Sequence, residues 1–389
     1  MNIKTKLLIL LTTIISIFLL FACVDESFYD NYDSEDHKYC ENYFWKPENF
    51  QIQRKPLFYI NNTQHGFTAT KYIEYISDNL YKRVCFTNRE LEAALWLIEE
   101  LLAIGYTWDC IEIQVFYADD PNISEYLHWD DWNWKDSLSF WNIDKNIIRE
   151  YSQNIILTVP GKSRSTIIVG AHYDSLPYPG ASDNASGMAL LLESTQRMLS
   201  SDNYHTIVYV FFGAEEIGSV GSKVYYDRLS SEQKENIVMM INADVLIEGS
   251  FFMYSTGYLG NKNYDLMREP EANETSLRVN MIAQEIIDLF DLDLYFLPQC
   301  IRLGADAQVF LRNGHTIVIM AALNPQPQDN DVEIYTFYES NALSARNILH
   351  SPQDCFHFIS ETWPGMIEDA MYTYSTFLEG LLLMKPLNS

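Results

Sequence analysis

Apolar residues recur every three or four positions in two stretches of the first third of the chain. This spacing places them on one face of an α-helix. We therefore predict helices over residues 71–80 and 88–104. The second helix is expected to end at Gly105, because glycine readily adopts the conformation that closes a helix. The apolar run Ile111–Phe116 predicts a strand.

From residue 154 onward, near-continuous apolar runs alternate with helical stretches. Such runs are typical of strands covered on both faces, and their alternation with helices is typical of a parallel sheet. The sequence therefore predicts an α/β protein whose sheet is mixed, parallel in its centre, and covered by helices on both faces. The expected strands are 155–159, 167–171, 207–212, 238–243 and 316–321, and the expected helices are 185–199, 219–229, 277–289 and 366–384.

The N-terminus has the pattern of an export signal. Lys4 and Lys6 precede an uncharged run from Leu7 to Ala22, which is shorter than the roughly 20 residues that a spanning helix needs. The junction before Cys23 resembles a bacterial lipobox, in which the cysteine is lipidated; an ordinary cleaved signal or a short anchor is the alternative. We predict a signal peptide with lipobox over 1–23, a linker over 24–60 and one domain over 61–389. The protein is then expected to be exported to the bacterial cell envelope, held to the membrane only by a lipid anchor; secretion is the alternative.

The chain is strongly acidic, with 26 Lys and Arg against 53 Asp and Glu and a formal charge of −27. This balance argues against nucleic acid and against an anionic lipid surface as partners. The cysteines beyond Cys23 form no C-x-x-C pair, which argues against a thiolate zinc site. In an oxidising compartment one or two disulfides are expected among them. These cysteines are Cys40, Cys85, Cys110, Cys300 and Cys355.

Residues 117–147 are rich in tryptophan. We interpret this segment as an insertion packed on its own aromatic side chains; a cover over a substrate cleft is the alternative. Four of the eight tryptophans of the chain lie there: Trp129, Trp132, Trp134 and Trp141.

Metal-binding residue types follow three of the predicted strands. His172 and Asp174 follow the strand at 167–171, the pair Glu215-Glu216 follows 207–212, and Asp244 follows 238–243. In open α/β sheets, ligands bind outside the carboxyl ends of the strands, so these side chains are expected to meet there. Imidazole and carboxylate ligands suit zinc, and one carboxylate can serve two ions.

A further acidic residue, Asp183, lies in the loop G-A-S-D-N-A-S-G before a predicted helix. It has two interpretations. It is either a metal ligand or the residue that caps the helix, since Ser-Asp-Asn is a good capping sequence.

Five segments together resemble successive motifs of peptidase family M28, the zinc aminopeptidases. They are G-A-H-Y-D-S, G-A-S-D-N-A-S-G, G-A-E-E-I-G-S-V-G-S, I-N-A-D and, near the C-terminus, L-H-S-P-Q-D with His350 and Asp354. The resemblance covers roughly residues 70–385. It implies a fold of the zinc-dependent exopeptidase type and a metal-dependent aminopeptidase that removes N-terminal residues from peptides with a free N-terminus.

The resemblance also implies a role for each matching residue. Asp183 would bridge two zinc ions, with His172 and Asp244 completing one site. Glu216 and His350 would complete the other. Glu215 would be the general base that activates a metal-bridging water, and Asp174 would orient His172. Members of the family also hold the peptide bond after the bridging aspartate, here Asp183–Asn184, in cis.

Two other functions stay open within the same resemblance. Glutaminyl cyclases keep similar ligands with a single zinc, but they carry a tryptophan before the last histidine where this chain has Leu349. Receptor-like relatives are binding modules that have lost their metal ligands. Asp306 is expected to have a structural role near the site, His357 is the histidine to check as a substitute ligand, and loop 324–347 is expected to shape side-chain preference.

Overall fold

The computed structural model describes residues 64–120, 123, 127–129, 132–256, 274–297, 306–323 and 348–384. The predicted signal and lipobox (1–23), the predicted linker (24–60) and the loop 324–347 lie outside the described residues. Among the helices that are described, none combines the length and the apolar character needed to cross a bilayer.

The centre of the fold is a mixed eight-stranded sheet in the order β1-β4-β6-β5-β7-β10-β8-β9. Its middle strands β6, β5, β7 and β10 are parallel to one another, and antiparallel strands flank them. This confirms the predicted α/β fold with a centrally parallel sheet. The strands are β1 (Ile111–Tyr117), β4 (Tyr151–Val159), β5 (Ser163–His172), β6 (His205–Phe212), β7 (Ile237–Ala243), β8 (Phe251–Ser255), β9 (Tyr295–Phe296) and β10 (Ile317–Leu323).

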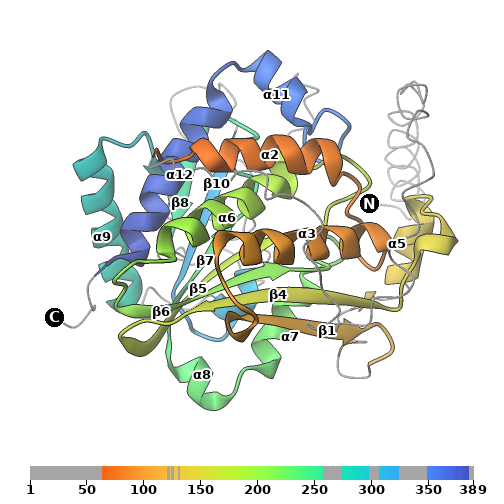
Figure 1. The fold of residues 1–389 in the computed structure, drawn as a ribbon, viewed down its shortest axis with the longest axis horizontal. Coiled ribbons are helices and arrows are strands. Elements are labelled where there is room, and N and C mark those ends of the chain that lie inside the picture. Colours follow the sequence, from red (N-terminus) through yellow and green to blue (C-terminus); the bar gives the residue numbers. More distant parts are fainter. Residues whose placement is uncertain are drawn as a thin grey trace, which may run out of the picture. The chain divides into compact units, whose positions relative to one another are not determined.

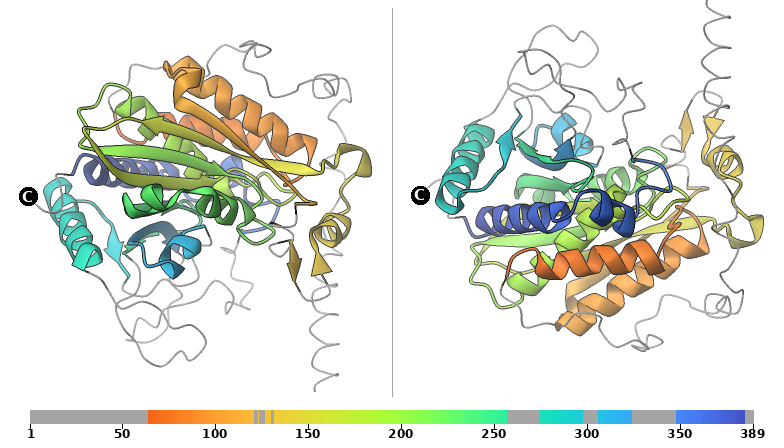
Figure 2. Two further views of the ribbon diagram at one scale, coloured as in Figure 1. Left: turned by 90° about the horizontal axis from the view of Figure 1, so that it is seen from below. Right: turned by 90° about the horizontal axis from the view of Figure 1, so that it is seen from above.

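Helices cover both faces of the sheet (Figures 1 and 2). On one face α6 packs against the central strands, and α2, α3 and α12 pack around α6; α9 packs against α12. On the other face α7 packs against β4, and α10 packs on α7. The helices are α2 (Phe67–Asn79), α3 (Asn88–Ile104), α6 (Ser186–Met198), α7 (Val220–Arg228), α8 (Ser231–Glu235), α9 (Glu274–Phe290), α10 (Gln308–Arg312), α11 (Phe356–Thr362) and α12 (Met366–Leu382).

The carboxyl ends of the three central strands are level with one another. His172 at the end of β5 is paired with Phe212 at the end of β6, and Gly170 is paired with Asn242, one residue before the end of β7. A side chain at Gly170 would collide with the ring of Phe212 and with Met240. Because the parallel strands are paired in this register, the residues that follow them emerge at one edge of the sheet.

The described part of the tryptophan-rich segment packs against residues outside the segment, and its interpretation as a locally packed insertion stays a prediction. Its described elements are β2 (His128–Trp129), β3 (Trp132–Asn133) and α5 (Trp134–Phe140). Trp134 is buried, with its ring centroid 4.6 Å from that of Phe86. The same apolar cluster includes Ala214 and Ile217, on either side of the Glu215-Glu216 pair. The segment therefore supports the turn that carries those glutamates.

The described cysteines form no disulfide. Cys85, Cys110 and Cys355 are all free thiols. The expected disulfides therefore do not occur among these three residues, while Cys40 and Cys300 lie outside the described part of the chain.

Candidate metal centre

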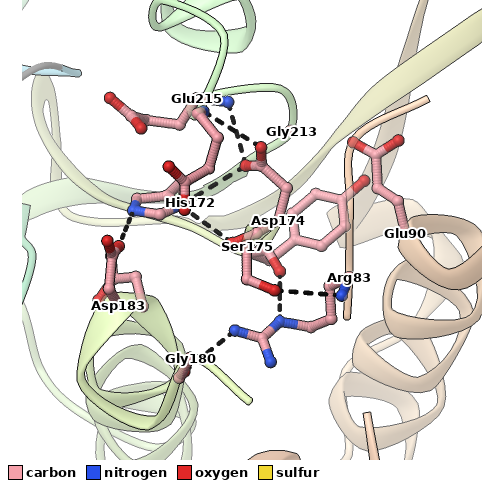
Figure 3. Close-up of polar contacts among 12 residues, drawn as sticks. Arg83, Glu90, His172, Asp174, Ser175, Gly180, Asp183, Gly213 and Glu215 are labelled. Atoms are coloured by element: carbon pink, nitrogen blue, oxygen red, sulfur yellow. Dashed lines mark hydrogen bonds and ion pairs between the residues drawn. The ribbon is translucent and has the colours of Figure 1, made fainter. Parts of the chain in front are cut away.

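His172 is the centre of the first group of metal-binding atoms. Its Nε2 lies 3.0 Å from Oδ1 of Asp183 and 3.3 Å from Oδ1 of Asp244. The ring is almost completely buried, with 1% of its side chain exposed. Its other nitrogen, Nδ1, lies 3.1 Å from the main-chain oxygen of Asp174 (Figure 3). One ring nitrogen is thus directed into the group while the other is held by the protein.

A second group of metal-binding atoms forms around His350. Its Nε2 lies 2.9 Å from Oδ2 of Asp183 and 3.6 Å from Oε2 of Glu216. Within each group the candidate ligand atoms all lie within 4.8 Å of one another. Asp183 belongs to both groups, and it directs one carboxylate oxygen to each histidine. The structure therefore brings together all five residues that the sequence proposed as ligands.

Asp183 does not cap the following helix. It lies in the short π-helical turn η6 (Ala181–Ala185), where Asp183 and Asn184 have non-helical backbone angles. Helix α6 begins at Ser186, and Gly187 N–H donates to the side chain of Asn184 instead. The capping interpretation of Asp183 was therefore wrong. The peptide bond Asp183–Asn184 is cis, which confirms that prediction.

The turn after β6 separates the two adjacent glutamates. Glu216 Oε1 accepts a hydrogen bond from Leu176 N–H at 3.0 Å, so Oε2 is left to face His350. Glu215 belongs to neither group of candidate ligands. Its Oε1 instead accepts a hydrogen bond from Ser219 Oγ at 3.3 Å. The two side chains thus differ in position: Glu216 belongs to the second group of metal-binding atoms, whereas Glu215 lies outside both groups.

Asp174 anchors the same turn to the end of β5. Its two carboxylate oxygens accept the N–H groups of Glu215 and Glu216 at 3.0 and 3.2 Å. Asp174 Oδ1 also lies 3.5 Å from Nδ1 of His172. The expected contact with the imidazole is present, and the hydrogen bonds to the turn add a second function to this residue.

The site contains more acidic side chains than basic ones, and burial shifts their pKa values. Burial, together with Asp183, raises the pKa of Glu216 to about 8, and burial raises the pKa of Glu215 well above its usual range. Burial opposes protonation of His350, but contact with Asp183 and the charge of Glu216 raise its pKa to about 10. The two histidines alone do not supply enough positive charge to balance the buried carboxylates of this cluster.

The residues present fit a divalent cation of the zinc class. Asp244 Oδ1 is buried and lies 3.3 Å from Nε2 of His172, the same ring nitrogen that faces Asp183. Two buried carboxylates that converge on one imidazole nitrogen are costly unless a cation pairs with them. Imidazole nitrogens and carboxylate oxygens are common zinc ligands. The donor set and the converging buried carboxylates together support metal binding at this edge of the sheet.

The other histidines whose side chains the structure describes lie away from both groups. His357 Nε2 contacts Asp78 at 3.0 Å, so it is not a substitute ligand. His205 contacts Ser165 Oγ, and His315 contacts the hydroxyl of Tyr226. The side chain of His128 lies outside the described part of the structure.

Asp306 is completely buried near the centre. Burial raises the pKa of its carboxyl to about 7, with His172 and Asp244 among the charges that act on it. These facts agree with a structural role near the site, which stays a prediction.

Two residues near the site were not found by sequence analysis. Arg83 is fully buried and donates to the main-chain oxygens of Tyr173 and Gly180, which flank the loop to Asp183. Glu90 is fully buried beside Gly213 and accepts hydrogen bonds from Ser152 Oγ and Phe86 N–H. Figure 3 shows the guanidinium of Arg83 directed toward Gly180, and Glu90 on the side of Asp174 away from Asp183. Neither belongs to a motif, because most of their partners are backbone groups.

The fold and the two groups of donors define an α/β protein with a candidate site for two divalent cations that share one aspartate. The chain belongs to peptidase family M28, whose sequence profile matches residues 154–375.

Curated relatives match the chain over limited stretches. Aminopeptidase YwaD of Bacillus subtilis is 35% identical over 127 residues, which are 31% of this chain and 28% of that protein. The probable lipoprotein aminopeptidase LpqL of Mycobacterium tuberculosis is 37% identical over 98 residues, which are 24% of this chain and 20% of that protein. The chain thus spans less than a third of the length of these two relatives.

Solved structures share the fold over most of the chain. The zinc aminopeptidase BSAP from Bacillus subtilis has a TM-score of 0.56 at 17% identity, covering 81% of this chain and 94% of that one. A glutaminyl cyclase from an Acidobacteriales bacterium has a TM-score of 0.55 at 15% identity, covering 85% of this chain and 99% of that one. At such identities the likeness supports the fold of the zinc-dependent exopeptidase type, and it extends to both kinds of enzyme.

Proposed function

We propose that this protein is an exported zinc aminopeptidase that removes the first residue from peptides with a free N-terminus. The observation that carries the proposal is Asp183, which directs one carboxylate oxygen to His172 and the other to His350. A carboxylate shared by two groups of donors is suited to a pair of metal ions. Membership of the family and the curated relatives named as aminopeptidases support the same activity.

In the proposed site, His172, Asp183 and Asp244 would hold one zinc ion, and Asp183, Glu216 and His350 would hold the other. A pair of bound zinc ions supplies Lewis acidity, which polarises a peptide carbonyl and lowers the pKa of water. The role of the protein is to hold the metal-binding atoms in fixed positions. Strand β5 ends at His172, and Asp174 fixes the backbone of Glu216, so the two donor groups stay in a constant relation.

Glu215 is the proposed general base. It lies on the same turn as the proposed ligand Glu216 and remains outside both donor groups. A carboxylate in that position takes the proton from the attacking water and then gives it to the amine that leaves when the peptide bond breaks. Ser219 restrains Glu215 by its hydrogen bond to Oε1.

The test is hydrolysis of a panel of aminoacyl-p-nitroanilides by the purified protein, with and without added zinc. We expect zinc-dependent release of nitroaniline, no release from the N-acetylated substrates, and a fall in kcat of at least a hundredfold in Glu215→Gln. Unchanged hydrolysis in Glu215→Gln would show that another group is the base. His357→Asn is the control for His350→Asn, because His357 contacts Asp78 rather than the site.

Glutaminyl cyclase is the second candidate, because solved cyclase structures are as similar in fold as the peptidases. The donor groups alone do not separate the two activities, because cyclases keep similar ligands with a single zinc. Leu349 favours the peptidase, since cyclases carry a tryptophan directly before the last histidine. Cyclisation of a peptide with N-terminal glutamine, measured beside the anilide assay, separates the two activities. A protein with neither activity and no bound zinc would instead be a binding module.

Export and lipid attachment at Cys23 are part of the proposal. They are supported by the apolar run before Cys23 and by the relative named as a probable lipoprotein aminopeptidase. Expression of the full chain in a bacterial host should place the protein in the membrane fraction, and Cys23→Ser should release it or leave its signal uncleaved. A Cys23→Ser protein that is processed and fractionates like the parent would contradict lipidation and favour an ordinary cleaved signal.

A further inference from the structure

The loop that leads to the shared aspartate is held by a buried arginine. Arg83 donates to the main-chain oxygens of Pro179 at 3.0 Å and Gly180 at 3.2 Å, which are the last residues before η6. It also donates to Tyr173 O at 2.8 Å, directly after His172. A single guanidinium therefore binds both ends of the segment that joins His172 to Asp183.

The same loop is held on its N–H side by a buried aspartate. Asp354 accepts the N–H groups of Ser182 and Asp183 on its two carboxylate oxygens, at 2.6 and 3.1 Å. Its main-chain oxygen accepts the N–H of Ala181 at 3.0 Å. Asp354 thus binds three successive N–H groups, the last of which belongs to the shared aspartate itself.

These two residues come from distant parts of the chain and have opposite charge. Both are almost completely buried. Arg83 binds carbonyl groups up to residue 180, and Asp354 binds the N–H groups from residue 181 onward. Asp354 is also four residues from His350, so the segment that supplies one proposed ligand also fixes the backbone of another.

We propose that Arg83 and Asp354 are positioning residues that set the place of Asp183 and thereby the affinity of the centre for zinc. The inference rests on the proposed metal site and names two residues that touch neither substrate nor metal. A carboxylate that serves two ions must keep its orientation toward both. Replacement of a residue that holds a metal ligand in place without touching the metal typically weakens metal affinity by about 10- to 100-fold.

The test uses Asp354→Asn and Arg83→Lys in the full-length protein. Asn places an NH2 group against a backbone N–H, and Lys keeps the charge but not the planar fork of donors. Zinc affinity and stoichiometry are measured by competition with a chromophoric chelator, and the rise in Tm on adding zinc is recorded separately. We expect the zinc Kd to rise at least tenfold in each variant and the zinc-induced rise in Tm to shrink.

The double variant tests whether the two residues act on one loop. If they do, its loss of affinity is smaller than the product of the two single losses. If the loss of zinc affinity in the double variant equals the product of the two single losses, Arg83 and Asp354 act separately, contrary to the proposal.

Glu193→Gln is the matched control. Glu193 is also a buried carboxylate that accepts two backbone N–H groups, from Gly66 and Ala69, but it lies between helices away from the centre. Its replacement should lower Tm and leave the zinc Kd within about twofold of the parent.

Several results would overturn the inference. One is a parental zinc Kd in Asp354→Asn together with a loss of Tm like that of Glu193→Gln. Another is failure of both site variants to fold when Glu193→Gln folds, because the pair would then act on folding alone. If the parent itself binds no zinc, the proposed function fails as well, so the two failures are distinguishable.

Discussion

The carboxylate of Asp174 accepts a hydrogen bond from the backbone N–H of Glu215 at 3.0 Å. This contact joins the segment after β5 to the turn after β6 and fixes the backbone of the proposed base. Because a second oxygen of the same carboxylate accepts the next N–H, the direction in which both glutamates leave the turn depends on Asp174.

We expect Asp174→Asn to lower kcat by about 10- to 100-fold with a smaller change in KM, because the substitution turns one acceptor into a donor that opposes a backbone N–H. The measurement is steady-state hydrolysis of an aminoacyl anilide at saturating zinc. Asp78→Asn is the control, since Asp78 contacts His357 on the surface. Equal kcat in the parent and in Asp174→Asn would contradict the role of Asp174.

Removal of metal should destabilise the protein, and the shared aspartate should dominate this effect. A ligand bound only to the folded state stabilises it by about 2.7 kcal/mol when its concentration is one hundred times its Kd. Thermal unfolding with and without a chelator measures the difference. Asp183→Asn should reduce the difference more than Glu216→Gln does, because Asp183 belongs to both donor groups. The reverse order would argue against a shared ligand.

The metal-free protein should lose stability as the pH rises from about 6 to about 9. The pKa of Glu216 is raised to about 8 by burial and by Asp183, so ionisation of this carboxyl costs stability as the pH rises toward that value. Contact with Asp183 and the charge of Glu216 raise the pKa of His350 to about 10 against the effect of burial, so the folded protein keeps this proton while the unfolded chain loses it, and the stabilisation it gives declines as the pH rises toward 10. Both groups therefore act with the same sign.

Denaturant unfolding of the metal-free protein at several pH values checks this dependence. Glu216→Gln should flatten the slope, and zinc should do the same. Stability that increases over this range would contradict the charge balance described for the site.

Trp134 should be more sensitive to substitution than Trp141, the other tryptophan of the segment whose burial is described. It is buried against Phe86, so Trp134→Ala should cost about 3 kcal/mol or more of unfolding free energy. Trp141 is only partly buried against the same cluster, so Trp141→Ala should cost less. Denaturant titration compares the two. Equal losses of unfolding free energy in the two variants would contradict the greater dependence of the cluster on the ring of Trp134.

The sequence predicts the site well where its residues follow apolar strands. His172, Glu216 and Asp244 come within four residues of the ends of three neighbouring parallel strands, and parallel strands bring these ends to one edge. His350 was recognised only through its motif, because its contact with Asp183 joins distant segments.

Other features could not be predicted because the local sequence does not encode them. The stretch Ser182-Asp183-Asn184 is compatible with a helix cap, and only the positions of His172 and His350 show that its carboxylate is used elsewhere. Arg83 binds main-chain oxygens, which every residue has, so no pattern of side chains indicates its partners. Strand β8, at five residues, is too short to show a clear period.

The order of the donors along the chain has a consequence for biosynthesis. His172, Asp183 and Asp244 leave the ribosome well before His350, and β10 and α12, which complete the fold around them, also come later than Asp244. A nascent chain that ends between Asp244 and His350 therefore contains one complete donor group and two of the three members of the other. Only a chain that extends through His350 contains both groups, so a translation product that ends earlier lacks the paired centre.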